Sequence, residues 1–334
     1  MRRLWPLFLL LLAACAPRLT GVNPERPPSP ADWGPKSAPV EWWYVSAYLP
    51  REGLAFHWAF FKFWAPEGTR ILGLPYWLFY PYPLHASHLA VTDLKNDRLI
   101  VLEKHDFPSP AAVVRGDPLF LKLDGWTLRQ SADGFVLDAG PIKLDLWPLK
   151  PAVVHPPGYS GTAETGRMYY VSYTRLGLAG RILGRQVAGY AWMDHQWGEQ
   201  MAGYSARWDW FGLRLSNFAE VMLYRIRDPK GRVVAVHADY VDPQGRARKL
   251  KNVRMIPLEY WTSPVTGYRY AVAWHVAAEG LDLILRPLRL AQEIRSKSTR
   301  VVYWEGPEAG EGVAFGERVR AEGMGEFVGG PWPR

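Results

Sequence analysis

Apolar and polar residues alternate with a period of two along most of this chain, which is the pattern of half-buried β-strands. The clearest pair of segments is "EWWYVSAYL" at Glu41–Leu49 and "GLAFHWAFFKFW" at Gly53–Trp64, with the turn-like residues Pro50, Arg51 and Glu52 between them. This pair predicts a β-hairpin. Hardly any segment keeps a helical period, so the predicted fold class is all-β.

Further alternating segments follow at hairpin spacing, up to "RVVYWEG" near the end of the chain. Turn residues recur between them, as at Asp228–Gly231 and Asp242–Gly245. Many short strands with regular turns are typical of barrels and sandwiches. The 334 residues leave room for two domains, which we place at 39–205 and 206–334.

The N-terminus carries a targeting signal. "MRRLWPLFLLLLAAC" has a basic start, an apolar run of signal-peptide length and a final stretch, Leu12 to Cys15, that is similar to a bacterial lipobox. We expect residues 1–14 to be a lipoprotein signal peptide and Cys15 to be the lipid anchor. An ordinary secretory signal and a buried N-terminal strand are the alternatives. Cys15 is the only cysteine, so disulfides and cysteine-metal sites are excluded.

The segment after the signal is rich in proline and polar residues and has no periodicity. Residues 15–38 are therefore predicted to form a disordered, extended tether. No second apolar stretch approaches the roughly 20 residues of a membrane-spanning helix. We expect an extracytoplasmic protein whose soluble body is lipid-anchored to the cell envelope.

Composition and charge exclude several functions. The formal charge is +8, but no run of five or six like charges occurs, so no nucleic-acid partner is expected. No HExxH or CxxC motif and no Gly-rich phosphate loop stands out, and we expect neither a metal nor a cofactor. Ser160 is followed directly by Gly161, which does not match the GxSxG motif of serine hydrolases. The aromatic share of 14% favours an aromatic core or a wide apolar cavity.

One stretch, "GYAWMDHQWGEQ" at Gly189–Gln200, places an Asp and a His between two tryptophans. If it is a strand, alternation puts His195 and Trp197 on one face, and Trp192 and Asp194 on the other. His195 and Trp197 would then point into the same space. In the alternative interpretation, Asp194 and His195 end a core strand and satisfy backbone groups in the next turn.

A second stretch, "RWDWFGLRL", places Asp209 on a face with three apolar side chains. Desolvation there would raise the pKa of the carboxyl and make it a proton donor. The alternative is a salt bridge with Arg207 or Arg175. His57, in "FHWAFFKF", is either a pocket histidine or a hydrogen-bonded core residue.

Several of these segments, in this order, resemble the carotenoid 1,2-hydratases (hydroxyneurosporene synthases) and the AttH-like predicted secreted hydrolases. The resemblance extends over most of the mature chain and implies two tandem lipocalin-like β-barrel domains, each of a kind that encloses a small apolar ligand. The matching segments are "EWWYVSAYL" (Glu41–Leu49), "SHLAVTD" (Ser87–Asp93), "YYVSYTRL" (Tyr169–Leu176), "GYAWMDHQWG" (Gly189–Gly198), "WDWFGLRL" with "EVMLYRIRDPKG" (Trp208–Gly231) and "YWEG" (Tyr303–Gly306).

The hydratase branch adds water to a terminal double bond of a linear carotenoid without a cofactor. Under this resemblance, Asp209 is the candidate acid that protonates the alkene. Trp197 would stabilise the carbocation through its ring face, an effect worth up to about 2 kcal/mol. His195, oriented by Asp194, would take the proton from water.

Five residues complete the candidate ligand-binding set: Trp192, Trp208, Trp210, His57 and Tyr170. Three functions remain open for this constellation. The chain is a lipid-anchored lipocalin-like protein that binds an isoprenoid or other apolar lipid, an isoprenoid hydratase or secreted hydrolase, or an envelope protein whose aromatic motifs only join two barrels. An ABC-type exporter is a possible partner of the AttH-like branch. A filled centre without a cavity of roughly 300 Å³ or more would favour the third function.

Overall fold

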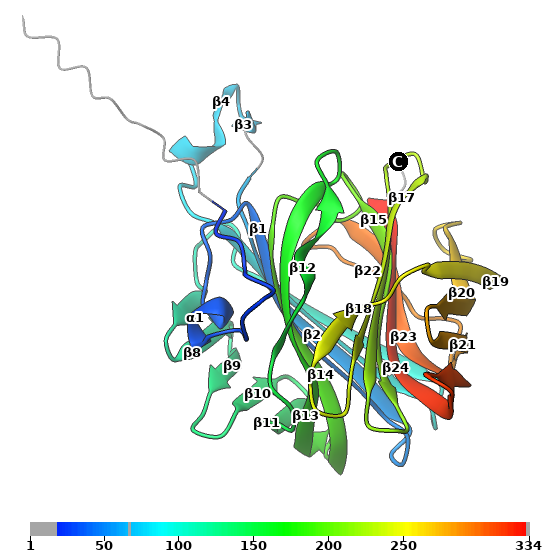
Figure 1. The fold of residues 1–334 in the computed structure, drawn as a ribbon. Helices are drawn as coiled ribbons and strands as arrows, with labels where there is room; N and C mark the ends of the chain where they lie inside the picture. The colour runs from blue at the N-terminus through cyan, green and yellow to red at the C-terminus, as the bar shows by residue number, and fades with distance from the viewer. Residues whose placement is uncertain (1–18, 66–67, 332–334) are drawn as a thin grey trace, which may run out of the picture.

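The structure is a computed structural model, and it describes residues 19–65 and 68–331. Nearly all of its regular structure is strand, in two large curled sheets that follow one another along the chain. Figure 1 shows them side by side, the first in blue to green and the second in yellow-green to red. The predicted fold class, all-β with two lipocalin-like β domains, is confirmed.

The first sheet, which we call the first barrel, has 12 strands in the order β6-β5-β2-β1-β14-β13-β11-β10-β9-β8-β7, with β12 paired to β13. Its strands are β1 (Val40–Leu49), β2 (Leu54–Phe63), β5 (Leu84–Asp93), β6 (Arg98–His105), β7 (Val113–Gly116), β8 (Leu119–Leu123), β9 (Trp126–Gln130), β10 (Phe135–Ala139), β11 (Ile142–Pro148), β12 (Val153–Thr162), β13 (Gly166–Ile182) and β14 (Arg185–Gly198).

The second sheet, the second barrel, has 10 strands in the order β18-β17-β16-β15-β24-β23-β21-β20-β19, with β22 paired to β23. Its strands are β15 (Arg207–Leu215), β16 (Glu220–Arg227), β17 (Val233–Val241), β18 (Ala247–Lys249), β19 (Arg254–Thr262), β20 (Arg269–Ala278), β21 (Leu281–Pro287), β22 (Glu293–Arg295), β23 (Val301–Ala314) and β24 (Glu317–Pro331). The sheets change over between β14 and β15, at residues 199–206.

Short elements lie outside the two sheets. A four-residue helix α1 (Pro30–Trp33) precedes β1. Between β2 and β5 the chain forms a small hairpin of β3 (Arg70–Ile71) and β4 (Leu74–Pro75), followed by a 3₁₀ turn η1 (Tyr76–Leu78). No helix in the described part of the chain is long and apolar enough to cross a membrane.

Strand alternation divides the buried side chains among three cores. In each barrel one face of the sheet turns inward, as with Trp43 and Met193 in the first barrel and Phe211 and Trp274 in the second. The opposite faces of the two sheets pack against each other, where β1 meets β24 and β2 meets β23. We call this third core the seam. Its buried apolar members are Tyr44, Ala55, Ala59, Ala90, Tyr170, Trp192, Ala206, Trp208, Trp210, Met222, Tyr224, Ile226, Ile294, Val301, Tyr303, Met324 and Val328.

The segment before β1 does not form the disordered tether that the sequence predicts for 15–38. From residue 19 onward it packs on the first barrel, and Trp33 is only 4% exposed. Trp33 stacks on Tyr173 with ring centroids 4.6 Å apart, and its carbonyl accepts a hydrogen bond from Trp43 Nε1 at 2.7 Å. One tryptophan buries enough apolar area to order a short proline-rich segment. The signal peptide at 1–14 and the anchor Cys15 lie outside the described residues.

Candidate functional site

The seam holds a buried carboxyl, Asp194, near the C-terminal end of strand β14. Its two oxygens accept hydrogen bonds from Tyr170 Oη at 2.9 Å, Ser172 Oγ at 2.5 Å and Trp192 Nε1 at 2.5 Å. Burial raises the pKa of Asp194 to about 6, against the opposing effect of these donors. Trp210 Nε1 donates to the Tyr170 hydroxyl at 3.1 Å and thereby ties β15 of the second barrel into the same network.

A second carboxyl, Glu326 on β24, faces Asp194 across the seam. Trp208 Nε1 donates to Glu326 Oε2 at 3.1 Å. Burial raises the pKa of Glu326 to about 7, and the nearby charge of Asp194 adds to the rise. Both carboxyls line a narrow space of about 20 Å³ whose walls are Trp42, Tyr44, Asp194, Gln196, Trp208, Trp210, Tyr224 and Glu326.

A wider apolar space of about 120 Å³ adjoins this narrow one. The two spaces share Trp42 and Trp208 as walls, and the two indoles stack with centroids 6.0 Å apart. The wider space is lined by Val40, Trp42, Phe61, Phe63, His88, Met201, Ala202, Tyr204, Trp208, Thr299, Val301 and Tyr303. Its volume is below the roughly 300 Å³ of a ligand pocket, which by the criterion given above favours a filled interface between the two barrels. The space has room for only one end of a longer apolar molecule.

A third buried acid, Glu305 on β23, lies deeper in the seam. Tyr44 Oη donates to Glu305 Oε1 at 2.5 Å, and His57 Nδ1 lies 3.1 Å from the same oxygen. Burial raises the pKa of Glu305 well above its ordinary value and lowers that of His57 to about 3. Both shifts favour a neutral pair, in which the acid carries the proton.

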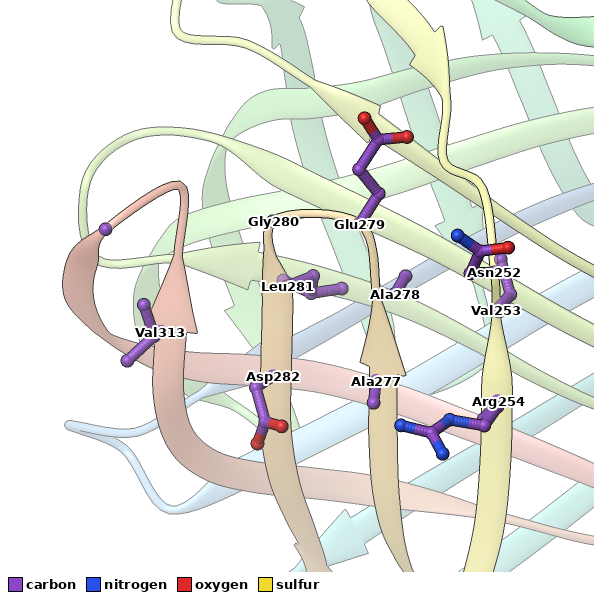
Figure 2. Close-up of a pocket in the computed structure, with 11 residues that line it drawn as sticks. Asn252, Val253, Arg254, Ala277, Ala278, Glu279, Gly280, Leu281, Asp282 and Val313 are labelled. Atoms are coloured by element: carbon purple, nitrogen blue, oxygen red, sulfur yellow. The ribbon is translucent and has the colours of Figure 1, made fainter.

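A wide hollow of about 830 Å³ lies elsewhere, at the hairpin ends of the second barrel (Figure 2). It opens broadly to solvent. Of its charged walls, Asp282 is paired with His275 at 3.1 Å, and none is buried. We therefore place the candidate site in the seam and not here.

The seam arrangement supplies the parts of acid–base chemistry on an apolar molecule. Glu326 is protonated for part of the time near neutral pH, while Asp194 is mostly ionised, because their pKa values are about 7 and about 6. Three indoles, those of Trp42, Trp208 and Trp210, are among the walls of the space between them. Among residues 19–65 and 68–331, no group of three or more His, Cys, Asp or Glu side chains is placed to hold a metal ion.

Comparison with known proteins identifies the family. The AttH-like family model matches residues 21–330. This chain belongs to the AttH-like family. A crystal structure of an AttH protein from Nitrosomonas europaea is similar at 25% sequence identity with a TM-score of 0.75, over 93% of this chain and 99% of that one. Kievitone hydratase from Nectria haematococca has the same fold at 14% identity with a TM-score of 0.69, over 95% and 97% of the two chains. No curated protein matches the sequence.

In this AttH-like protein His195 and Trp197 share a face of β14, as alternation predicts, but that face turns into the first barrel. His195 Nε2 lies 2.9 Å from Glu41 Oε1, and its ring stacks on Trp43 with centroids 4.6 Å apart. Trp197 Nε1 donates to the carbonyl of Thr20 at 2.7 Å. The two side chains are fully buried in the first barrel, on the opposite side of the strand from Asp194.

Asp209 points into the second barrel, because it alternates on β15 with the seam residues Trp208 and Trp210. Its carboxylate pairs with Arg225 at 2.7 Å and Arg227 at 3.1 Å. The sequence leaves a neutral acid and a salt bridge open. The salt bridge is what forms, with these arginines and not with Arg207 or Arg175. The structure therefore does not bring Asp209, His195 and Trp197 together.

The other candidates do meet in the seam. Trp208 and Trp210 line the narrow space. Trp192 and Tyr170 do not line it, but both donate hydrogen bonds to Asp194. His57 lies deeper, beside Glu305. The catalytic and ligand-binding roles assigned to these residues stay predictions.

Sequence reasoning missed Glu326 and Glu305. Each is an acid whose nearest neighbours along the strand are apolar residues or glycine, in "MGEFVGG" and "VVYWEGP". An acid at such a position must be paired or neutral, and that signal could have found both. Their shared location could not be read from the chain, because β23 and β24 meet β1 and β14 only in the folded protein.

Proposed function

We propose that this AttH-like protein binds one end of an apolar isoprenoid or lipid between its two barrels and adds water to a carbon–carbon double bond in it. The observation that carries the proposal is the pair Asp194 and Glu326, two acids with raised pKa values in one indole-walled space. Among the residues that the structure describes, neither acid has a Lys, Arg or His side chain within hydrogen-bond distance, and the groups that donate to them are hydroxyls and indoles.

The reaction follows from this geometry. Protonated Glu326 gives its proton to one alkene carbon, forming a C–H bond and a carbocation on the other carbon. The ring faces of Trp42, Trp208 and Trp210 stabilise the cation. A water oxygen then bonds to the cationic carbon, and the Asp194 carboxylate accepts the proton released. Transfer of this proton to Glu326 restores the starting state, so the sum is alkene plus water to alcohol.

Fold likeness supports the reaction class. Kievitone hydratase is a hydratase by name and has the same fold. The family likeness to carotenoid hydratases adds support for an apolar, unsaturated substrate. The lipobox-like sequence at Leu12–Cys15 supports an extracytoplasmic, lipid-anchored location, which gives access to membrane-dissolved substrates and to an exporter.

A second candidate function is binding and hand-over of the same lipid without chemistry. It is favoured by Asp194, whose oxygens already accept three hydrogen bonds from the protein. Under this function the two seam carboxyls transfer no proton to the ligand. The apolar space then binds the ligand and releases it unchanged.

Mass spectrometry separates the two functions. The chain from Ala16 onward, which keeps every described residue, is incubated with a linear carotenoid or a squalene-like polyene, and the organic extract is measured. A product one water heavier, lost in Glu326→Gln and Asp194→Asn but kept in Glu322→Gln on the same strand, supports the hydratase. Retention of unchanged polyene supports the binding function, and no binding contradicts both.

The same assay tests the first hypothesis from the sequence. Asp209→Asn and His195→Ala abolish the product if these residues are the acid and the base. If Asp209→Asn and His195→Ala both lose the product while Glu326→Gln keeps it, and all three variants are folded, the reaction does not take place in the seam.

A further inference from the structure

One segment of the surface is apolar far beyond what solubility requires. Residues 71–82, "ILGLPYWLFYPY", contain no charged side chain. We call this segment the apolar loop. Its large side chains are exposed to solvent: Leu72 93%, Leu74 51%, Trp77 62%, Leu78 53%, Phe79 48% and Tyr82 51%. Scattered exposed hydrophobic residues are normal, but a contiguous group of this kind marks an interaction surface.

The tip of the apolar loop is built against local preference. Leu72 and Gly73 turn β3 into β4, and Leu72 has a φ of 50°. Leucine rarely adopts this left-handed conformation. Leu72 is nevertheless held there with its side chain in solvent, where it contributes nothing to a core. Leu183 and Phe315 adopt the same conformation before a glycine in other two-residue hairpin turns, so the exposure of Leu72, and not its backbone, is what marks the tip.

The base of the loop is fixed to the first barrel. Tyr80 is only 5% exposed, and its ring contacts Tyr76, Tyr82 and Phe107 at centroid distances of 5.8–6.0 Å. Phe107, 48% exposed, extends the patch. The base of the loop is therefore packed against the first barrel, while the side chains at its tip stay exposed to solvent.

The apolar loop leaves the barrel at the end where the N-terminal segment lies. Thr20 is bonded to Trp197, Trp197 pairs with Glu41 across β14 and β1, and Glu41 pairs with Lys62 just before the loop begins. Cys15 is four residues from Leu19, which limits the distance between them to about 15 Å. A lipid on Cys15, as in the proposed function, would hold this end of the barrel against the bilayer.

Three spaces that share wall residues lie between the loop and the seam. A cavity of about 340 Å³ at the loop base is lined by Tyr76, Phe107 and Phe63 among others. Phe63 is also a wall of the 120 Å³ apolar space, which in turn shares Trp42 and Trp208 with the carboxyl-lined space. We call these three spaces the path. The apolar loop stands at its outermost space, and Asp194 and Glu326 line its innermost one.

We propose that the apolar loop inserts into the interfacial layer of a lipid bilayer and places the outer end of this path against the membrane. Trp and Tyr side chains prefer the headgroup level, and Leu and Phe the acyl boundary just below it. Lys297, a wall of the outer cavity, suits the adjoining anionic headgroups. The absence of charge in the loop favours a lipid surface over a protein partner, whose contacts would include polar groups at the rim. That the path carries the substrate rests on the proposed function. The insertion itself does not.

Vesicle binding tests the insertion. The chain from Ala16, which lacks the anchor, is floated with phosphatidylcholine vesicles and with vesicles that also contain phosphatidylglycerol. The triple variant L72S/W77S/F79S is expected to bind at least tenfold more weakly than the unaltered chain. A matched triple, L258S/V265S/L290S, removes residues of similar exposure from the second barrel and is expected to bind as the unaltered chain does.

Two results would overturn the proposal. They are absence of vesicle binding by the unaltered chain, which would assign the loop to a protein partner, and equal binding by both triples. Bromolipid quenching of indole emission gives a second measurement that needs no disruptive variant. Quenching is expected to fall in Trp77→Phe and to stay unchanged in Trp64→Phe if only Trp77 enters the bilayer. Turnover of a detergent-dissolved polyene is independent of vesicles, so a failed hydratase assay and a failed insertion assay are distinguishable.

Discussion

The barrel interiors and the seam are buried to a similar degree, yet they treat charge differently. In the first barrel, Glu41 lies 2.6 Å from Lys62 Nζ and 2.9 Å from His195 Nε2. In the second, Asp209 pairs with two arginines. In the seam, Asp194 and Glu326 are met by hydroxyl and indole donors instead. A buried acid that pairs with a cation stays ionised and stabilises the fold. A buried acid that has only neutral donors can bind and release a proton near neutral pH.

Two residues depart from this division. Glu220 is buried on the same face of β16 as the seam residue Met222, and it pairs with Lys150 at 2.9 Å and Arg175 at 2.6 Å. Glu308, on the inward face of β23, is fully buried, and neither of its oxygens has a hydrogen-bond partner. Burial raises its pKa well above the ordinary value. It is therefore a neutral acid inside the second barrel, and nothing in the structure explains why it is there.

The largest effect is expected from breaking an interior pair. Glu41→Ala leaves Lys62 and His195 buried without their shared partner, which typically costs about 3–5 kcal/mol. Urea unfolding followed by circular dichroism measures the change. A loss below about 1 kcal/mol would mean that interior pairing is no more important than surface pairing.

A smaller effect of opposite sign is expected in the seam. The pKa of Glu326 is raised from 4.5 to about 7, so its contribution to stability is complete below pH 4.5 and is lost as the pH rises through 7. Glutamine imitates the protonated form. Glu326→Gln is therefore expected to match the unaltered chain at pH 4 and to exceed it at pH 8, on the order of 2 kcal/mol after allowance for partial exposure.

Urea unfolding at the two pH values measures this difference, with Glu322→Gln as the control. Glu322 pairs with Arg214 at 3.3 Å, and its own side chain is 38% exposed. Equal stability of Glu326→Gln and the unaltered chain at pH 8 would show that Glu326 titrates normally, and would remove the basis for its role as an acid.

The smallest effect is expected on the surface. Arg246 lies 2.7 Å from Asp242, but its side chain is 78% exposed. Arg246→Ala should change the free energy of unfolding by less than about 0.5 kcal/mol. A thermal melt is enough to check it, and a larger loss would show that the Asp242 turn organises more of the second barrel than its contacts indicate.

Much of the fold follows from local alternation. The faces of β14 and β15 are predicted correctly, because a period of two assigns His195 and Asp194 to opposite sides. Alternation does not say which side is a barrel interior. Both sides of β14 carry tryptophan, Trp192 on one and Trp197 on the other, so apolar character cannot distinguish the seam from the interior. Alternation therefore groups the residues of each face correctly, but it does not say which group lines the seam.

The remaining misses have long-range causes. Trp33 is buried because Tyr173 and Trp43 lie where it can reach them, and composition alone makes its segment look like a tether. The partners of Asp209 come from β16, a neighbouring strand whose register was unknown. Glu326 has its hydrogen-bond donor in Trp208 and its acidic neighbour in Asp194, and both lie more than 100 residues earlier in the chain.

The seam also bears on whether either half can exist alone. Its two halves present aromatic side chains on their outer faces, among them Tyr44 and Trp192 on one and Trp208 and Trp210 on the other. A single barrel released from its neighbour would expose these indoles and phenols to water, and a contiguous apolar face of this kind promotes aggregation. The link at residues 199–206 therefore keeps together two halves that protect each other from solvent.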